Sequence, residues 1–164
     1  MGIEAYKRTS VYKGALRILQ TLQAAHYEAY IVGGAVRDIQ MGRIPHDYDI
    51  VTSAMPEVVI DVLRTEGFIT TNVVGASFGV VVVTVGDDTY EVATYRSEQY
   101  GEDSHRPVIV KFSSTFLEDV QRRDFTINGL ALTENGEVRD EVGGLRDIVA
   151  RRLCTIGSSK ERFK

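Results

Sequence analysis

Apolar segments of strand-like length alternate with segments of helical spacing along this chain, and that alternation limits its fold more than any other feature. Residues 11–25 carry leucines at helical spacing and predict an amphipathic helix. Residues 28–34 predict a short apolar strand that stops at a glycine pair, and residues 35–42 predict a helix of about two turns. Residues 48–53 predict a second strand and residues 56–67 another helix. This pattern is typical of helices packed on a sheet.

The middle of the chain is rich in β-branched residues. Residues 68–75, 79–86 and 89–96 predict three further strands. The second of these contains four consecutive valines, which predict a strand buried on both of its faces. Residues 97–107 are polar and contain glycine and proline, so they predict a mobile loop.

The last third of the chain begins with a helix start signal. Thr115 and Glu118 have the spacing of a capping box, and they introduce a predicted helical stretch over residues 116–132. Residues 147–153 predict a last helix or strand. Together the elements predict one α/β domain over residues 1–164, with a mixed sheet of about five strands and flanking helices.

The composition excludes several classes of protein. Hydrophobic residues make up 43% of the chain, enough for a buried core, and the net charge of −4 argues against a wide basic face for nucleic acid. Cys154 is the only cysteine, which excludes an internal disulfide and a cysteine-rich zinc site. No apolar run approaches the roughly 20 residues of a membrane span. We therefore expect a soluble, cytoplasmic protein that makes no membrane contact.

Two aspartates stand at the start of the second predicted strand. Asp47 and Asp49 flank Tyr48, and alternate residues of a strand point to the same face, so their carboxylates are expected to lie close together. Like charges repel unless a cation lies between them, and Mg²⁺ prefers oxygen ligands of this kind. The alternative is a solvated strand end, because Asp-x-Asp also occurs by chance.

Glu91 is the candidate for a third acidic residue of such a site. It lies in an otherwise apolar strand, where a charged residue is costly unless it is paired or bound to metal. A sheet face exposed to solvent is the alternative.

Gly33 and Gly34 close one predicted strand and open a helix. Backbone N–H groups at such a turn can approach a triphosphate closely. Arg37 follows one helical turn later and can add a bidentate phosphate contact, while Asp38 can bind sugar hydroxyls or anchor the loop. The alternative is a structural turn with an exposed Arg-Asp pair.

A second polar group lies in residues 122–128, which read Arg-Arg-Asp-Phe-Thr-Ile-Asn. On a helix, Asp124 and Asn128 would share one face and could offer a polar strip to the ribose and phosphates of a nucleotide. An ordinary amphipathic helix with a solvated basic end is the alternative.

The ordered set Gly-Gly-x-x-Arg-Asp (33–38), Asp-x-Asp (47–49) and Arg-Arg-Asp-Phe-Thr-Ile-Asn (122–128) resembles the class II tRNA nucleotidyltransferase and bacterial poly(A) polymerase family. That family belongs to the polymerase β-like nucleotidyltransferases, and the resemblance covers about residues 15 to 163. It implies a catalytic head domain that transfers CMP, AMP or both from CTP and ATP to a tRNA 3′ end. The chemistry implied is two-metal-ion catalysis with Mg²⁺ as the cofactor.

The resemblance also implies roles by position. The residues that match the metal-binding aspartates are Asp47 and Asp49, with Glu91 matching the third acidic position. The residues that match the triphosphate-supporting loop are Gly33, Gly34, Arg37 and Asp38. The residues that match the motif contacting the nucleotide's sugar and phosphates are Arg122, Arg123, Asp124 and Asn128. Residues 96–107 resemble the family's flexible loop, which helps the switch from adding C to adding A.

The chain departs from the family at its end. Residues 161–164 stop just before the position of the family's base-reading helix. We therefore expect the neck, body and tail domains to lie outside this chain, either in the rest of a longer enzyme or in a separate chain. Poly(A) polymerase is the alternative activity. A head that binds nucleotide but has little transfer activity alone is the other alternative.

Overall fold

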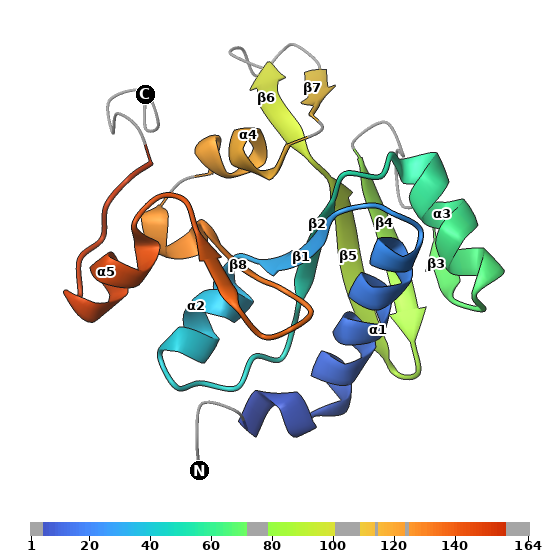
Figure 1. Ribbon diagram of the computed structural model, residues 1–164, viewed down its shortest axis with the longest axis horizontal. Helices are drawn as coiled ribbons and strands as arrows, with labels where there is room; N and C mark the ends of the chain where they lie inside the picture. The colour runs from blue at the N-terminus through green and yellow to red at the C-terminus, as the bar shows by residue number, and fades with distance from the viewer. Residues whose placement is uncertain (1–4, 72–78, 101–108, 114, 124, 157–164) are drawn as a thin grey trace.

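Seven strands of the described chain form one mixed sheet in the order β3-β4-β5-β2-β1-β8-β9, and β6 pairs with β7 separately (Figure 1). The structure is a computed structural model that describes residues 5–71, 79–100, 109–113, 115–123 and 125–156. The strands are β1 (Ala29–Val32), β2 (Asp49–Thr52), β3 (Ile69–Thr71), β4 (Val80–Val85), β5 (Asp88–Thr94), β6 (Arg96–Tyr100), β7 (Ile109–Phe112), β8 (Leu130–Leu132) and β9 (Val138–Asp140). The helices are η1 (Ala5–Arg8), α1 (Ser10–Ala24), α2 (Gly34–Gln40), α3 (Pro56–Thr65), α4 (Phe116–Gln121), η3 (Thr126–Asn128) and α5 (Gly144–Val149).

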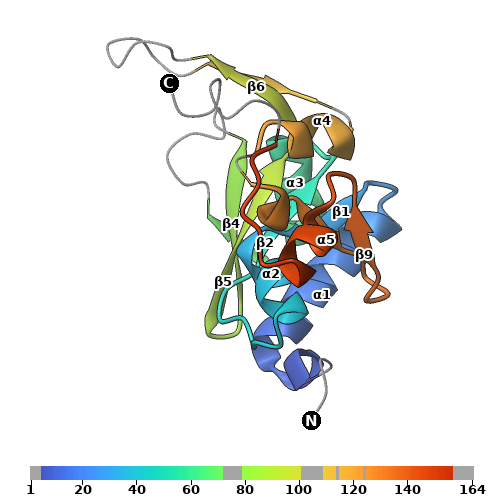
Figure 2. The same cartoon turned by 90° about the vertical axis from the view of Figure 1, so that its left-hand side faces the viewer.

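Two apolar cores lie on opposite faces of the sheet. Neighbouring strand residues point to opposite faces, and Ile31 and Ile50 belong to the larger core while Val32 and Val51 belong to the smaller one. The larger core is packed by α1, α2 and α3, and the smaller one receives Phe116 from α4. Helices α1 and α3 lie together beside β4 and β5 (Figure 1), while α4 and the β6–β7 hairpin lie far from the N-terminus (Figure 2).

The predicted α/β class is confirmed, but the main sheet has seven strands rather than about five. The two additional strands of this sheet, β8 and β9, come from the last third of the chain. Strand β8 lies inside the predicted helical stretch 116–132, which is therefore wrong beyond the end of α4. Strand β8 pairs with the central strand β1, and all three of its residues are buried. Tertiary pairing outweighs the local helical pattern here.

The start signal of α4 is confirmed. Thr115 is its N-cap residue and accepts the backbone N–H of Glu118 at 3.4 Å. The Glu118 carboxylate accepts the hydroxyls of Thr115 and Ser113, both at 3.0 Å. The side chains of the first turn thus satisfy one another and hold the entry to the helix.

Two predictions for the middle of the chain need correction. In β4, Val81 and Val83 are fully buried while Val80 and Val82 are only half-buried, so this strand has one buried face and not two. The predicted loop 97–107 begins instead with strand β6, whose register against β7 shifts between Arg96 and Glu98. Residues 101–107 of that loop lie outside the described residues, as do residues 72–75 of the strand predicted after α3.

Candidate active site

The glycine turn lies beside the start of the aspartate strand. Strands β1 and β2 are antiparallel and pair Val32 with Asp49, so Gly33 leaves the sheet next to the point where β2 begins. Gly33 is the N-cap of α2 and has a φ of 78°, a positive value that favours glycine. Its carbonyl accepts the N–H groups of Val36 and Arg37 at 3.1 and 3.3 Å. The predicted strand–turn–helix is therefore confirmed.

The aspartate pair stands on either side of a buried tyrosine. Tyr48 is 1% exposed and belongs to the larger core, whereas Asp47 and Asp49 are both exposed. Strands β2 and β5 are parallel neighbours, and their register pairs Asp49 with Glu91. Both carboxylates therefore emerge from adjacent strands on the sheet face that also carries Val51 and the smaller core.

Electrostatics connect these acids to the arginine segment. Desolvation raises the pKa of Asp49, the neighbouring Glu91 raises it further, Arg123 lowers it, and Asp47 raises it again. Arg123 is thus close enough to act on Asp49, although the two residues come from different parts of the chain. A carboxylate in a field of this kind gains from a cation that offsets its acidic neighbours.

The described residues contain no group of three His, Cys, Asp or Glu side chains that could hold a metal ion by themselves. Asp47 and Glu91 both raise the pKa of Asp49, but the three carboxylates do not form a closed cage for a metal ion. The donor set still fits Mg²⁺, which is commonly bound by one or two carboxylates and completes its shell with water and substrate phosphates. The residues that fit this role are Asp47 and Asp49.

Arg37 joins the glycine turn to the second polar segment. Its Nη1 donates to Asn128 Oδ1 at 3.1 Å, and its Nε and Nη2 donate to Asp38 Oδ1 at 3.3 and 3.2 Å. The structure thus brings together three of the predicted residues. Arg37 is oriented by two side chains rather than extended freely into solvent, and Asp38 acts as its anchor.

The predicted polar strip on one helix face is wrong. Helix α4 ends at Gln121, and Asn128 lies in the separate 3₁₀ turn η3. This turn is held from elsewhere, because the Thr126 N–H donates to the Cys154 carbonyl at 2.9 Å and its hydroxyl donates to Asp147 at 2.5 Å. Asn128 therefore reaches the site through the turn. Asp124 lies outside the described residues.

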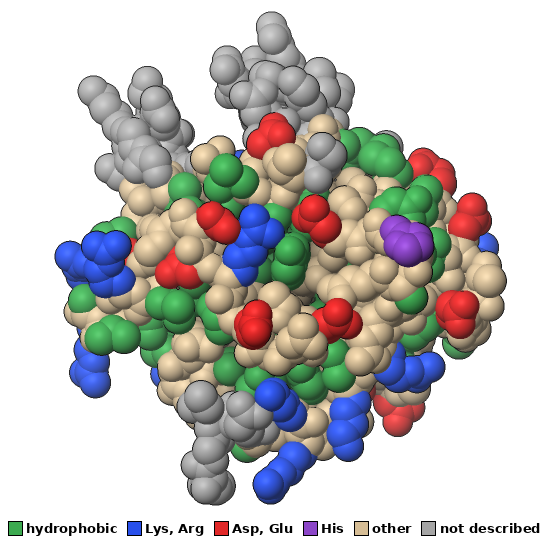
Figure 3. Space-filling view, in the orientation of Figure 1, with side chains coloured by type: hydrophobic (Ala, Val, Ile, Leu, Met, Phe, Trp, Pro, Cys, Tyr) green, Lys and Arg blue, Asp and Glu red, His purple; other side chains and the backbone are tan. Residues whose placement is uncertain are grey.

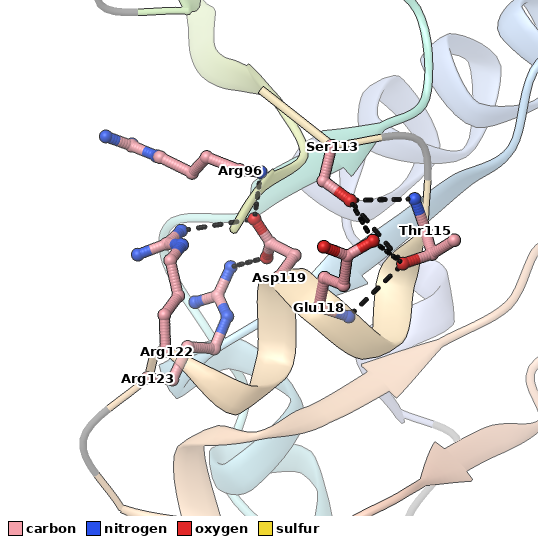
Figure 4. A network of polar contacts seen from close by, with 7 residues as sticks. All are labelled: Arg96, Ser113, Thr115, Glu118, Asp119, Arg122 and Arg123. Atoms are coloured by element: carbon pink, nitrogen blue, oxygen red, sulfur yellow. Dashed lines mark hydrogen bonds and ion pairs between the residues drawn. The ribbon is translucent and has the colours of Figure 1, made fainter. Parts of the chain in front are cut away.

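Arg122 and Arg123 converge on a carboxylate that the sequence analysis did not single out. Asp119 accepts Arg122 Nη2 at 3.3 Å and Arg123 Nη2 at 3.1 Å (Figure 4). Burial lowers the pKa of Arg122, Asp119 raises it, and the nearby Arg123 and Arg96 lower it. The signal was present in the sequence, since an acid three and four residues before two arginines on a helix is placed to contact both.

The surface does not form one broad basic area on the side that Figure 3 draws. Acidic and basic side chains of the described residues are interspersed there, in keeping with the net charge of −4. Within the described chain, no helix combines the length and the apolar character that crossing a membrane requires.

The chain is similar to proteins named as CCA-adding enzymes. The chain is 45% identical to a CCA-adding enzyme of Geobacillus sp. (strain WCH70), over 93% of the chain and 36% of that enzyme. It is 44% identical to a CCA-adding enzyme of Streptococcus pyogenes serotype M2 (strain MGAS10270), over 94% of the chain and 37% of that enzyme. The chain thus spans little more than a third of the length of these relatives.

Solved structures give the same result. The CCA-adding enzyme of Bacillus stearothermophilus in complex with CTP matches with a TM-score of 0.80 and 39% identity, over 94% of this chain and 36% of that one. A tRNA nucleotidyltransferase with a primer tRNA and an incoming ATP analog matches with a TM-score of 0.66 and 29% identity, over 85% of this chain and 38% of that one. The sequence model of the family described as "Poly A polymerase head domain" matches residues 29–154. These matches confirm the resemblance seen in the ordered motifs, and the chain belongs to the Poly A polymerase head domain family.

Proposed function

We propose that this chain is the nucleotidyltransferase head of a tRNA 3′-end-adding enzyme, which transfers CMP, AMP or both from CTP and ATP. The observation that carries the proposal is the meeting of three segments far apart in sequence. The start of β2, with Asp49, lies beside the glycine turn, Arg37 of that turn's helix bonds Asn128, and Arg123 acts electrostatically on Asp49. One of the similar structures is a complex with CTP, and another is a complex with a primer tRNA and an incoming ATP analog.

The acidic residues form the part of the site that binds the metal cation. Asp47 and Asp49 would hold Mg²⁺, with Glu91 on the adjacent strand adding negative charge. When bound, Mg²⁺ supplies a Lewis acid that lowers the pKa of an attacking hydroxyl and offsets phosphate charge. The exposed carboxylates of Asp47 and Asp49, at the start of β2, are open to water, which can complete the coordination that two side chains leave unfilled.

The basic residues and the glycine turn form the part of the site that binds the triphosphate anion. Backbone N–H groups near Gly33 and Gly34 can approach a triphosphate closely, and Arg122 and Arg123 can offset the charge that grows on it. By their match to the family motif, Asn128 and Asp124 would contact the sugar and phosphates of the nucleotide. Phosphoryl transfer depends mostly on positioning and electrostatics, so no covalent protein nucleophile is required.

A product assay tests the proposal. The chain is incubated with Mg²⁺, labelled CTP and ATP, and a tRNA that lacks its 3′ CCA, and the product length is read on a gel. A discrete extension of one to three nucleotides supports the proposal, with Asp49→Asn inactive and Asp61→Asn, an exposed carboxylate on α3, active.

Two other outcomes would replace it. A long A tract would assign the chain to poly(A) synthesis, the activity named by the family's description. Magnesium-dependent nucleotide binding without any extension would make this chain a binding head that does not transfer nucleotides alone.

A further inference from the structure

Asp119 in α4 carries a fully buried carboxylate, 0% exposed. Its Oδ1 accepts the backbone N–H of Arg96 at 3.0 Å and Nη2 of Arg122 at 3.3 Å, and its Oδ2 accepts Nη2 of Arg123 at 3.1 Å. Figure 4 shows the carboxylate between these groups. A buried charge persists only where it is paired and hydrogen-bonded. Asp119 meets that condition through the two arginines and the first residue of β6.

The cluster around Asp119 holds more positive than negative charge. Three guanidinium groups, those of Arg96, Arg122 and Arg123, lie near one another, and Asp119 raises the pKa of both Arg96 and Arg122. Even with Asp49, on which Arg123 also acts, three cations face two carboxylates. The buried Nε atoms of Arg96 and Arg123 have no hydrogen-bond partner in the part of the chain that the structure describes. Excess positive charge and unpaired buried donors together favour an anionic ligand.

The contacts of Asp119 also limit where the two arginines lie. Arg122 and Arg123 stand three and four residues after it, and Figure 4 shows both side chains running from the end of α4 to the carboxylate. Their side chains remain 22% and 19% exposed, so part of each is open to a ligand. An arginine side chain loses conformational freedom when it binds an anion, and an oriented guanidinium has less to lose.

We propose that Asp119 is a positioning residue that holds the guanidinium groups of Arg122 and Arg123 where they contact the triphosphate of the bound nucleotide. The inference rests on the proposed function and deepens it by one residue that does not itself touch the nucleotide. Asp119 acts through the two arginines, and its own oxygens stay behind them.

The direction in which triphosphate affinity changes in Asp119→Asn distinguishes positioning from long-range electrostatics. Asp119→Asn keeps the size of the side chain and removes one negative charge, so long-range electrostatics alone would tighten the binding of a triphosphate. Positioning predicts the opposite. We expect the dissociation constants of CTP and of inorganic tripolyphosphate, both measured with Mg²⁺ by calorimetry, to rise about tenfold. The matched control is Glu118→Gln, the same change one residue earlier in α4, on a side chain that bonds Ser113 and Thr115 instead.

A double-mutant cycle separates positioning from a general loss of structure. In an Arg123→Ala background, Asp119→Asn should weaken tripolyphosphate binding by clearly less than tenfold, because one of the groups it orients is gone. If Asp119→Asn does not fold, Asp119→Glu, which keeps the charge but moves the oxygens, should show the same weakened binding. Unchanged or tighter binding in a folded Asp119 variant, or fully additive effects in the cycle, would overturn the inference. Failure of the wild-type chain to bind CTP at all would instead overturn the proposed function.

Discussion

Arg37 and Asn128 stand 91 residues apart in the sequence and share a hydrogen bond of 3.1 Å. Arg37 belongs to the helix that follows the glycine turn, and Asn128 to a 3₁₀ turn that follows the arginine pair. The bond therefore makes one site out of two motifs that are separate in the chain. The same guanidinium is anchored by Asp38 on its other edge, so its direction is set from two sides.

Removal of the Asn128 side chain should disturb the orientation of Arg37. A hydrogen bond to a charged group contributes about 1.5–3 kcal/mol, so we expect Asn128→Ala to weaken magnesium-dependent CTP binding about tenfold or more. Calorimetric titration measures the change. The control is Asn135→Ala, the same substitution at an exposed turn residue, and equal affinities for the two variants would contradict this role of Asn128.

Asp147 should make the stability of the fold depend on acid pH. The hydroxyl of Thr126 holds the pKa of this buried carboxyl below its ordinary value of 3.8, desolvation opposes this, and the Arg152 charge lowers it further. The ionised form is therefore the one that stabilises the fold, above about pH 3.8, and its contribution is lost as the pH falls through the lowered pKa.

Thermal unfolding of Asp147→Asn tests that dependence. The variant should melt below the wild type near neutral pH, and the gap should narrow once the pH drops below about 3.8. A gap that stays constant over the whole range would show that ionisation of Asp147 does not contribute.

Asp140 should stabilise the start of α5. Its Oδ1 accepts the N–H groups of Val142, Gly143 and Gly144 at 3.2, 2.8 and 3.0 Å, and its Oδ2 accepts that of Leu145 at 3.0 Å. Loss of a side chain that caps a helix start costs about 1–2 kcal/mol. We expect Asp140→Ala to lower the free energy of unfolding in urea by that amount, whereas Asp61→Ala changes it little. A loss no larger than that of the control would rule out the cap.

His26 should tolerate, and even favour, glycine. It follows the C-cap of α1 with a φ of 72°, and the N–H groups of His26 and Tyr27 donate to Gln23 and Leu22 at 2.9 and 3.1 Å. This is the Schellman arrangement, in which glycine usually takes the left-handed position.

The left-handed conformation costs a non-glycine residue about 1–2 kcal/mol, and glycine avoids this strain. Glycine also loses more conformational entropy on folding, which offsets part of the stabilisation. We expect His26→Gly to raise the free energy of unfolding by about 0.5 kcal/mol. His46→Gly, at an exposed histidine without a positive φ, should not raise it. A destabilised His26→Gly would contradict the reading of this turn.

The sequence predicts best the elements whose period and end signals agree. The first amphipathic helix, the strand that stops at Gly33, the short helix after it and the strand of Asp49 all appear close to the predicted bounds. The residue types around Gly33 decide that outcome locally, because a glycine with a positive φ both ends the strand and opens the helix.

The prediction fails where distant parts of the chain decide the structure. Leu130 and Leu132 have no local feature that distinguishes a helix from a strand, and their pairing with β1 and β9 selects the strand. The hydrogen bond of Arg37 with Asn128 and the electrostatic effect of Arg123 on Asp49 likewise depend on topology. Asp119 differs, since its spacing to Arg122 and Arg123 is local and the ordered motif can be extended to include it.

Equilibrium titration of the chain with CTP, first with Mg²⁺ and then with excess EDTA, shows whether Asp47 and Asp49 bind Mg²⁺ next to a bound triphosphate. We expect that CTP binding requires Mg²⁺, that Asp47→Asn and Asp49→Asn each abolish it, and that Asp61→Asn leaves it intact. CTP binding of equal strength in EDTA, or in both aspartate variants, would contradict this expectation.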